Sequence, residues 1–481
     1  MSHLVVDVGT SGVRAAIVRP DASVTHVHYR QVLPTTPNQG FVEFDAGAMA
    51  AAAVDVAWAA LDDGGPVVSM GITNQRASTV LWDRTTGQPV GPGIGWQDHR
   101  TVAMILGLQA QGIHLSPSSS ATKLAVLLDI ADPERDRDLC FGTIDTWMAW
   151  TLSDGELHVT DPSNAAVTGL LKLDASGWDP HVLEVLRIPE RVLPTIVDSS
   201  GLIGEARALP GAPPIAGIAG DQQASLIGQG CTRPGLAKIT FGTGGMVDLN
   251  VGEARPSFER RGPSGTFPIV AWRRGGRTTF GLEAFMLTAG QAVEWLRDDL
   301  GLIATSEESE KVAGMCATTG DVWFVPSLLG MGTPAWDFGA RGTLVGLTRG
   351  SGRPQIVRAV LEGVAQRGAD LVEAIEADGG VSLESLRVDG GMSANKVFIQ
   401  ALADAAGRPV EVSPVKEATT LGAAFLAGLA TGTWADEDEI AATWHAGSIV
   451  DPVRRPQRAR WRDACARAQG WIPELSALDF G

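Results

Sequence analysis

Four short glycine-containing segments of this chain each carry a polar side chain suited to phosphate chemistry. Asp7 precedes the turn 9–12, Asp221 follows a glycine, three glycines fall within 242–245, and two glycines follow Asp389. Carboxylates can accept protons or hold metal ions, and amides in glycine turns can bind anions. Each segment also has a plainer structural interpretation.

Asp7 ends the apolar segment 4–8, where burying a carboxylate is costly unless a cation or hydrogen bonds stabilise it. A divalent metal with phosphates would do so, and a turn-stabilising aspartate fits equally well. Arg14, on the return strand, could donate to phosphate oxygens or pair with any nearby acid. Both interpretations of each residue stay open.

Asp221 lies where an apolar strand ends and a helix begins, within residues 217–224. An acid at a strand end, with a glycine before it that allows close approach, is placed to take a proton from a substrate hydroxyl. The same position suits a helix N-cap, and taken alone it favours the N-cap.

The segments 242–245 and 388–395 could both approach a nucleotide through their backbones. The first has glycines enough for an anion nest, although any tight hairpin needs glycine too. The second runs from a strand through two glycines into a helix start, where a phosphate or a nucleoside could bind.

Strand and helix patterns alternate along the chain, which predicts an α/β fold with helices packed on sheet faces. A hairpin is expected around each of the turns 9–12 and 242–245, whose first glycines are 233 residues apart. This repeat suggests two similar domains, 1–228 and 229–481. The predicted helices include 46–61, 120–130, 180–186, 284–300, 355–378, 395–406 and 419–430, and the strands include 66–72, 80–83, 322–326 and 385–389.

The composition excludes several classes of protein. The 481 residues contain 38 Lys and Arg against 55 Asp and Glu, a net charge of −17, which argues against binding nucleic acid or an anionic membrane surface. No apolar run is long enough to span a bilayer, and no secretion signal is evident at the start, so a cytoplasmic protein is expected. The four cysteines are too dispersed for a zinc or redox pair. No Walker loop occurs, and the arginine-rich run 454–467 is most simply a solvated helix face.

Taken in order, the motifs resemble the FGGY carbohydrate kinases, relatives of hexokinase, actin and Hsp70, and within that family the glycerol kinases. The similarity extends from residue 4 to about residue 435 and is carried by the following strings: D-x-G-T at 7–10, GITNQR at 71–76, WQ at 96–97, HVTD at 158–161, GIAGDQQ at 217–223, GTGG at 242–245, WD at 336–337, ARG at 340–342, GLTRG at 346–350, RVDGG at 387–391 and LGAA at 421–424.

The resemblance implies two ribonuclease H-like domains of the actin and hexokinase type flanking a central cleft, and the use of ATP and Mg²⁺. Asp221 falls on the catalytic base and Asp7 on the acid that positions Mg²⁺. The nucleotide contacts implied by position are Thr10, Ser11, Arg14, Thr243, Gly290, Gly391 and Asn395. A possible homodimer is also a family expectation.

The implied polyol pocket departs from that of glycerol kinase. Its matching residues are Arg76, Trp96, Asp221 and Gln222, whereas the family's glutamate, tyrosine and phenylalanine are replaced here by Ala77, Ser118 and Met246. The chain's only tyrosine, Tyr29, is remote in sequence from Ser118. Unpaired substrate hydroxyls are costly, so we expect poor binding of glycerol and a preference for a tetritol, a pentitol or a ketopentose.

Asp98 could contribute to that pocket, or could form a surface salt bridge with Arg100. The leading hypothesis is an ATP-dependent sugar or polyol kinase that closes two domains over its substrates. The alternatives are a true glycerol kinase with a rebuilt pocket and a non-catalytic sugar or nucleotide sensor on the same fold.

Overall fold

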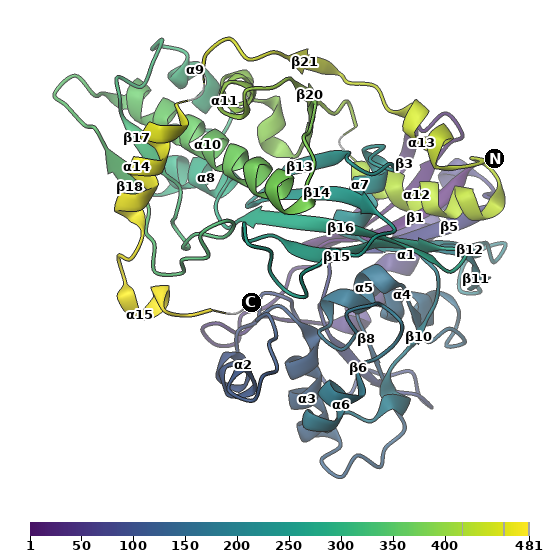
Figure 1. Ribbon diagram of the computed structural model, residues 1–481. Coiled ribbons are helices and arrows are strands. Elements are labelled where there is room, and N and C mark those ends of the chain that lie inside the picture. The colour runs from purple at the N-terminus through teal and green to yellow at the C-terminus, as the bar shows by residue number, and fades with distance from the viewer. Residues whose placement is uncertain (416, 456, 480–481) are drawn as a thin grey trace.

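The computed structural model describes residues 1–415, 417–455 and 457–479. Among these residues, thirteen strands form one mixed sheet that runs through both halves of the molecule (Figure 1). In sheet order the strands are β21 (Ser448–Val450), β20 (Val410–Val412), β19 (Leu386–Asp389), β13 (Ala237–Phe241), β14 (Gly245–Gly252), β16 (Arg277–Met286), β15 (Phe267–Arg274), β11 (Ser200–Glu205), β12 (Pro214–Gly220), β5 (Ser69–Asn74), β1 (His3–Val8), β2 (Gly12–Val18) and β3 (Val24–Gln31).

The sheet contains the same five-strand arrangement twice. In the first half, β1 pairs antiparallel with β2 and parallel with β5, and the order is β3-β2-β1-β5-β12. In the second half, β13 pairs antiparallel with β14 and parallel with β19, and the order is β16-β14-β13-β19-β20. The two expected hairpins are therefore the same element of a repeated α/β unit, which confirms the α/β fold class.

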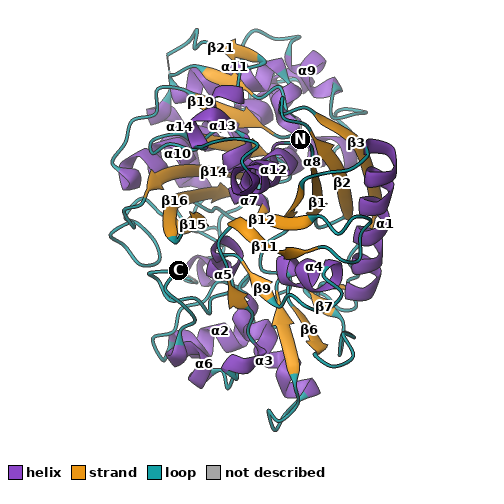
Figure 2. Cartoon of the chain, turned by 90° about the vertical axis from the view of Figure 1, so that its right-hand side faces the viewer, coloured by secondary structure: helices purple, strands orange, loops and turns teal. Residues whose placement is uncertain are grey.

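Helices cover both faces of the sheet. α1 (Ala46–Gly64) packs on β2 and β3, and α10 (Arg353–Gly379) packs on β14 and β16. α12 (Ala418–Thr431) lies on β1, β5 and β12, so a segment late in the chain contributes to the core of the first half. Figure 2 shows α12 and α7 (Asp221–Gly228) together in the middle of the molecule.

The remaining elements are short pieces around this frame. The small sheets pair β4 (Glu43–Phe44) with β7 (Gly93–Ile94), β6 (Val80–Asp83) with β8 (Leu139–Gly142), β9 (Val159–Thr160) with β10 (Thr195–Ile196), and β17 (Trp323–Val325) with β18 (Thr343–Val345). The other helices are α2 (Val102–Gln109), α3 (Ser120–Ala131), α4 (Ile144–Leu152), α5 (Pro162–Val167), α6 (Pro180–Val185), α8 (Gly290–Asp298), α9 (Glu308–Ala313), α11 (Lys396–Ala406), α13 (Glu437–Thr443), α14 (Arg458–Ala468) and α15 (Pro473–Ser476).

The prediction of a helix over 284–300 was wrong at its start. Residues 284–286 continue β16, because they pair with residues 245–247 of β14, and α8 begins only at Gly290. The local apolar pattern suits either structure, and the neighbouring strand decides between them. None of the helices in the described ranges combines the length and apolar character needed to cross a bilayer.

The arginine-rich run near the C-terminus is only partly solvated. Arg458 at the start of α14 is largely buried, and its guanidinium contacts Asp370 and Glu373 of α10. Trp461 is fully buried in the same interface. The expectation of a simply solvated face was therefore wrong for this side of α14, which anchors the C-terminal segment to α10.

The contact between α7 and α12 is close enough to require glycine. A Cβ on Gly422 would overlap the carbonyl oxygen of Ala224, and one on Gly228 would overlap the carbonyl oxygen of Ala418. Backbones this close leave no room for a side chain. The packing fixes α7, whose first residue is Asp221.

We expect Gly422→Ala to destabilise the protein by about 1–3 kcal/mol, because the added methyl group must push the two backbones apart. Gly107→Ala in α2 is the matched control, since a Cβ there would meet open space. That change should be neutral or stabilising by about 0.5–1 kcal/mol. Calorimetric unfolding of both variants tests the contact, and equal stability of the two would contradict it.

Candidate active site

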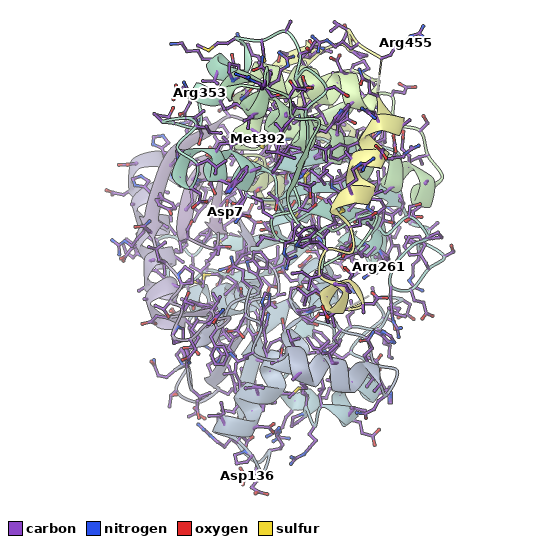
Figure 3. The ribbon with its side chains drawn as sticks, turned by 90° about the vertical axis from the view of Figure 1, so that its left-hand side faces the viewer. Asp7, Asp136, Arg261, Arg353, Met392 and Arg455 are labelled. Atoms are coloured by element: carbon purple, nitrogen blue, oxygen red, sulfur yellow. The ribbon has the colours of Figure 1, made fainter. Side chains whose placement is uncertain are left out.

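Asp7 lies at the end of β1 in the middle of the molecule, between regions marked by Asp136 at one end and Arg455 at the other (Figure 3). Thr420 of α12 donates a hydrogen bond to its Oδ2 at 3.5 Å. Burial raises the pKa of Asp7 to about 7, with Arg14 opposing this and Asp221 adding to it. A hard cation such as Mg²⁺ would stabilise a buried carboxylate that has acidic neighbours.

The first hairpin brings Thr10, Ser11 and Arg14 beside Asp7. Arg14 is in register with Asp7 across β1 and β2, and its guanidinium is paired with Glu417. The indole N–H of Trp96 donates to the Thr10 hydroxyl at 3.3 Å. The predicted phosphate hairpin therefore adjoins a residue of the predicted polyol pocket.

Asp221 is the first residue of α7, directly after β12. Its side chain is 36% exposed, and Arg76 Nε lies 3.4 Å from its Oδ1. Burial raises the pKa of Asp221 above its ordinary value, against the opposing effect of Arg76. An accessible carboxylate with a raised pKa beside a fixed cation is suited to accepting a proton.

Gly220 explains why the Arg76 side chain can lie so close to Asp221. A Cβ at this position would lie 2.8 Å from Arg76 Cγ, so any larger residue would displace the arginine. The Gly220 amide also donates to Ser163 Oγ at 2.9 Å. The glycine before the acid thus allows the close approach that the sequence suggested.

Three further charged residues, not singled out from the sequence, adjoin this centre. Glu283 Oε2 lies 2.8 Å from Arg76 Nη2. Lys238 lies 2.7 Å from Asp248 and donates to Gln222 Oε1 at 2.6 Å. All three occur inside strands whose alternate residues are apolar. A charged residue in such a strand is the sequence feature that could have identified them.

Two predicted nucleotide contacts, Gly290 and Thr243, meet at the second hairpin. The Gly290 amide donates to the Gly242 carbonyl at 2.8 Å, and a Cβ on Gly290 would lie 2.6 Å from that oxygen. Thr243 in the turn is exposed, and its carbonyl accepts the amide of Ala289 at 2.9 Å. These contacts fix the hairpin against the start of α8.

Gly391 and Asn395 differ in whether their surroundings leave room for a ligand. Gly391 is exposed, and a Cβ there would meet open space. Asn395 is the N-cap of α11: its side chain accepts the Phe398 amide at 3.0 Å and donates to Ser309 Oγ at 3.0 Å. Structural hydrogen bonds therefore occupy Asn395, whereas Gly391 leaves space beside the backbone.

The three replaced pocket positions are small or flexible. Ala77 is buried with a positive φ of 61°, and its carbonyl accepts the Ser120 hydroxyl at 2.9 Å. Ser118 Oγ lies 2.8 Å from Ser116 Oγ. Met246 is half-buried on β14. None of these three side chains carries a charge or an aromatic ring.

Asp98 is neither a surface residue nor free for a substrate. It is fully buried and bound by the Arg100 guanidinium at 2.8 Å and by the Val42 amide at 2.6 Å. Burial alone would raise the pKa of Asp98, but these hydrogen bonds hold it below its usual value. The expected salt bridge between Asp98 and Arg100 is therefore present, but it is buried and does not lie on the surface. Asp98 joins the loop that carries Trp96 to the backbone at Val42.

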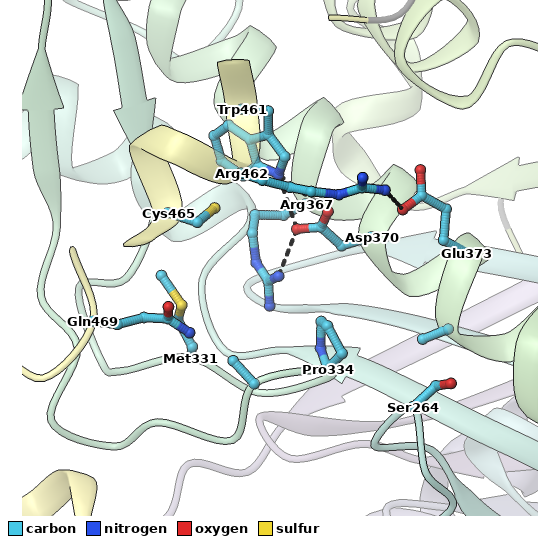
Figure 4. Close-up of a pocket in the computed structure, with 12 residues that line it drawn as sticks. Ser264, Met331, Pro334, Arg367, Asp370, Glu373, Trp461, Arg462, Cys465 and Gln469 are labelled. Atoms are coloured by element: carbon cyan, nitrogen blue, oxygen red, sulfur yellow. Dashed lines mark hydrogen bonds and ion pairs between the residues drawn. The ribbon is translucent and has the colours of Figure 1, made fainter. Parts of the chain in front are cut away.

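A pocket of about 420 Å³ lies elsewhere, between α10 and α14 (Figure 4). The charged groups on its wall bind one another: Arg367 donates to Asp370 at 2.7 Å, and so does the Trp461 indole at 3.0 Å. These contacts hold α14 on α10. We assign the pocket no part in the chemistry.

Comparison with known proteins agrees with this arrangement. Residues 2–228 match the N-terminal domain of the FGGY family of carbohydrate kinases, and residues 237–431 match its C-terminal domain. A protein named glycerol kinase from Trichlorobacter lovleyi is 44% identical over 493 residues, covering 97% of this chain and 99% of its own length. A glycerol kinase 2 from Thermotoga maritima is 38% identical, with the same coverage.

Solved structures are similar over nearly the whole chain. The glycerol kinase of Plasmodium falciparum with ADP has a TM-score of 0.90 at 27% identity, covering 97% of this chain and 98% of that one. A xyloylose kinase from Brucella ovis has a TM-score of 0.85 at 25% identity and covers both chains fully. These neighbours confirm the expected two-domain fold of the actin and hexokinase type. The chain belongs to the FGGY family of carbohydrate kinases and is an ATP-dependent kinase that phosphorylates an alcohol group.

Proposed function

We propose that this chain transfers the γ-phosphate of ATP to a hydroxyl of a polyol or sugar, with Asp221 as the general base. The observation that carries the proposal is the placement of Asp221: it starts a helix, stays partly exposed, has a raised pKa and lies beside Arg76. A binding protein would have no need of such a proton acceptor, which argues against a non-catalytic sensor.

The reaction needs positioning more than covalent chemistry. Asp221 takes the proton of the acceptor hydroxyl while its oxygen attacks the γ-phosphorus and the bond to ADP breaks. Thr10, Ser11 and Thr243 hold phosphate oxygens through the two hairpins, and Arg14 exchanges Glu417 for a phosphate. The proposed nucleoside contacts Gly290, Gly391 and Asn395 follow from the family resemblance.

Asp7 would hold Mg²⁺ through its waters, and the bound ion would neutralise charge on the phosphates. The support for this assignment is the acidic surrounding of Asp7, where a cation relieves the repulsion from nearby carboxylates.

For the acceptor, we propose a tetritol, a pentitol or a ketopentose. The support is the sequence at three positions, where Ala77, Ser118 and Met246 offer neither the carboxylate nor the rings that the resemblance associates with glycerol. Arg76, Trp96 and Gln222 remain to bind its hydroxyls. Glycerol is the second candidate, because relatives up to 44% identical carry the name glycerol kinase.

We further propose that residues 1–228 and 229–481 act as two domains that close over the substrates. The repeated strand order of the two halves supports this division. The homodimer is a proposal from the family resemblance alone, and sedimentation equilibrium tests it.

The first test is turnover with Mg-ATP and a panel of glycerol, erythritol, threitol, xylitol, ribitol, xylulose, ribulose and gluconate. We expect at least one acceptor longer than glycerol to have the highest kcat/KM. Asp221→Asn should lower kcat by about 100-fold or more, since the amide cannot accept the proton.

Asp62→Asn, an exposed change on α1, is the control and should keep full activity. No turnover of any acceptor, or equal turnover by Asp221→Asn, would overturn the kinase mechanism. Glycerol as the best acceptor by a wide margin would overturn only the pocket assignment.

The second test is the pH dependence of kcat/KM. We expect it to fall tenfold per pH unit as the pH drops below the pKa of Asp221, because the protonated carboxyl cannot act as a base. Since burial raises that pKa, the fall should begin above the ordinary aspartate value of about 3.9. Circular dichroism at each pH verifies that the protein stays folded, and a flat profile down to about pH 4 would argue against Asp221 as the base.

A further inference from the structure

A row of three charged side chains crosses neighbouring strands of the second half. Lys238 on β13 is in register with Asp248 on β14, which is in register with Glu283 on β16. The alternate residues Val247 and Leu249 point into the core on the other face of the sheet. The charged row therefore faces the first half of the molecule, although Lys238 and Asp248 are completely buried.

The Lys238 ammonium group has three acceptors around it. They are Asp248 Oδ2 at 2.7 Å, Gln222 Oε1 at 2.6 Å and Thr240 Oγ1 at 3.1 Å. Gln222 and Thr240 accept hydrogen bonds from the ammonium group, and Asp248 forms an ion pair with it. Asp248 supplies the opposite charge without which burying the lysine would be costly.

This contact determines which way the Gln222 amide points. Lys238 can only donate, so the amide oxygen of Gln222 must face it, and the NH₂ group must face the other way. Gln222 directly follows Asp221 at the start of α7. The side chain is thus held as a hydrogen-bond donor beside the proposed base.

We propose that Lys238, held in place by Asp248, is a positioning residue that fixes the Gln222 amide as a hydrogen-bond donor to an oxygen of the acceptor substrate. The inference rests on the proposed function and deepens it, because the acceptor must present a hydroxyl or carbonyl oxygen to this amide while a second hydroxyl reaches Asp221.

Charge balance explains how such a network tolerates burial. Arg76 and Lys238 bring two positive charges, and Asp221, Asp248 and Glu283 bring three negative ones when ionised. Burial raises the pKa of Glu283 to about 7, and the adjacent Asp248 adds to this effect. Protonation of Glu283 would make the group neutral, which would lower the cost of burying it.

The test replaces both partners together, as Lys238→Met with Asp248→Leu. Removing the lysine alone would leave Asp248 buried and unpaired, whereas an apolar pair of similar volume preserves packing. We expect a thermal midpoint near that of the natural protein and an unchanged KM for ATP. The KM of the best acceptor among glycerol, erythritol, xylitol and xylulose should rise by about tenfold, because Gln222 is no longer oriented.

The same double change in a Gln222→Ala background separates positioning from general damage. There it should raise the acceptor KM by less than twofold further, because its target is already gone. Arg408→Met with Glu376→Leu is the matched control. It removes an ion pair between α10 and the segment before β20, and should change neither KM. An acceptor KM unaffected by the Lys238 and Asp248 changes, or full additivity with Gln222→Ala, would overturn the inference.

Crystal structures of the natural protein and the Lys238→Met, Asp248→Leu variant give a readout that does not depend on turnover. We expect Gln222 to keep one conformation on Lys238 in the first and to move or lose definition in the second. If no acceptor is phosphorylated, the proposed function fails, but the crystal structures still test the positioning role. A Gln222 side chain that has not moved in the variant would refute that role, and one that has moved would support it.

Discussion

The contact between Arg76 and Asp221 is the interaction on which the rest of the site depends. A carboxylate that is to act as a base must be partly withdrawn from water, and that withdrawal is costly unless a cation stands nearby. Arg76 supplies the cation from the loop after β5, and Glu283 holds Arg76 from the opposite half. The proposed base, Asp221, therefore lies at the junction of the two halves, beside an arginine from the first half that is itself held by a glutamate from the second.

Glycine makes this junction possible in two places. Gly220 lets Arg76 pass against the backbone just before Asp221, and Gly422 lets α12 press on α7. Asp221 and Gln222 are the first two residues of α7. The close packing of α12 against this helix therefore also fixes the position of both residues. The stability of the core and the precision of the chemistry thus depend on the same short helix.

The net charge of the chain does not describe the charged groups of the site. The net charge is −17, and in the proposed mechanism the phosphates are held by hairpin amides, by Arg14 and by a cation at Asp7. Arg14 is meanwhile paired with Glu417. Within the internal row, Lys238 and Asp248 also pair with one another.

The sequence by itself predicted the α/β class, both hairpins, most helices and the position of Asp221, because these features are written in local patterns of glycine, apolar period and motif order. It did not predict that residues 284–286 form strand, that α12 joins the first half, or that Arg458 is buried. Nor did it single out Lys238, Asp248 and Glu283. These depend on strand register and on contacts between residues hundreds of positions apart, and only the tertiary structure decides which buried charges meet.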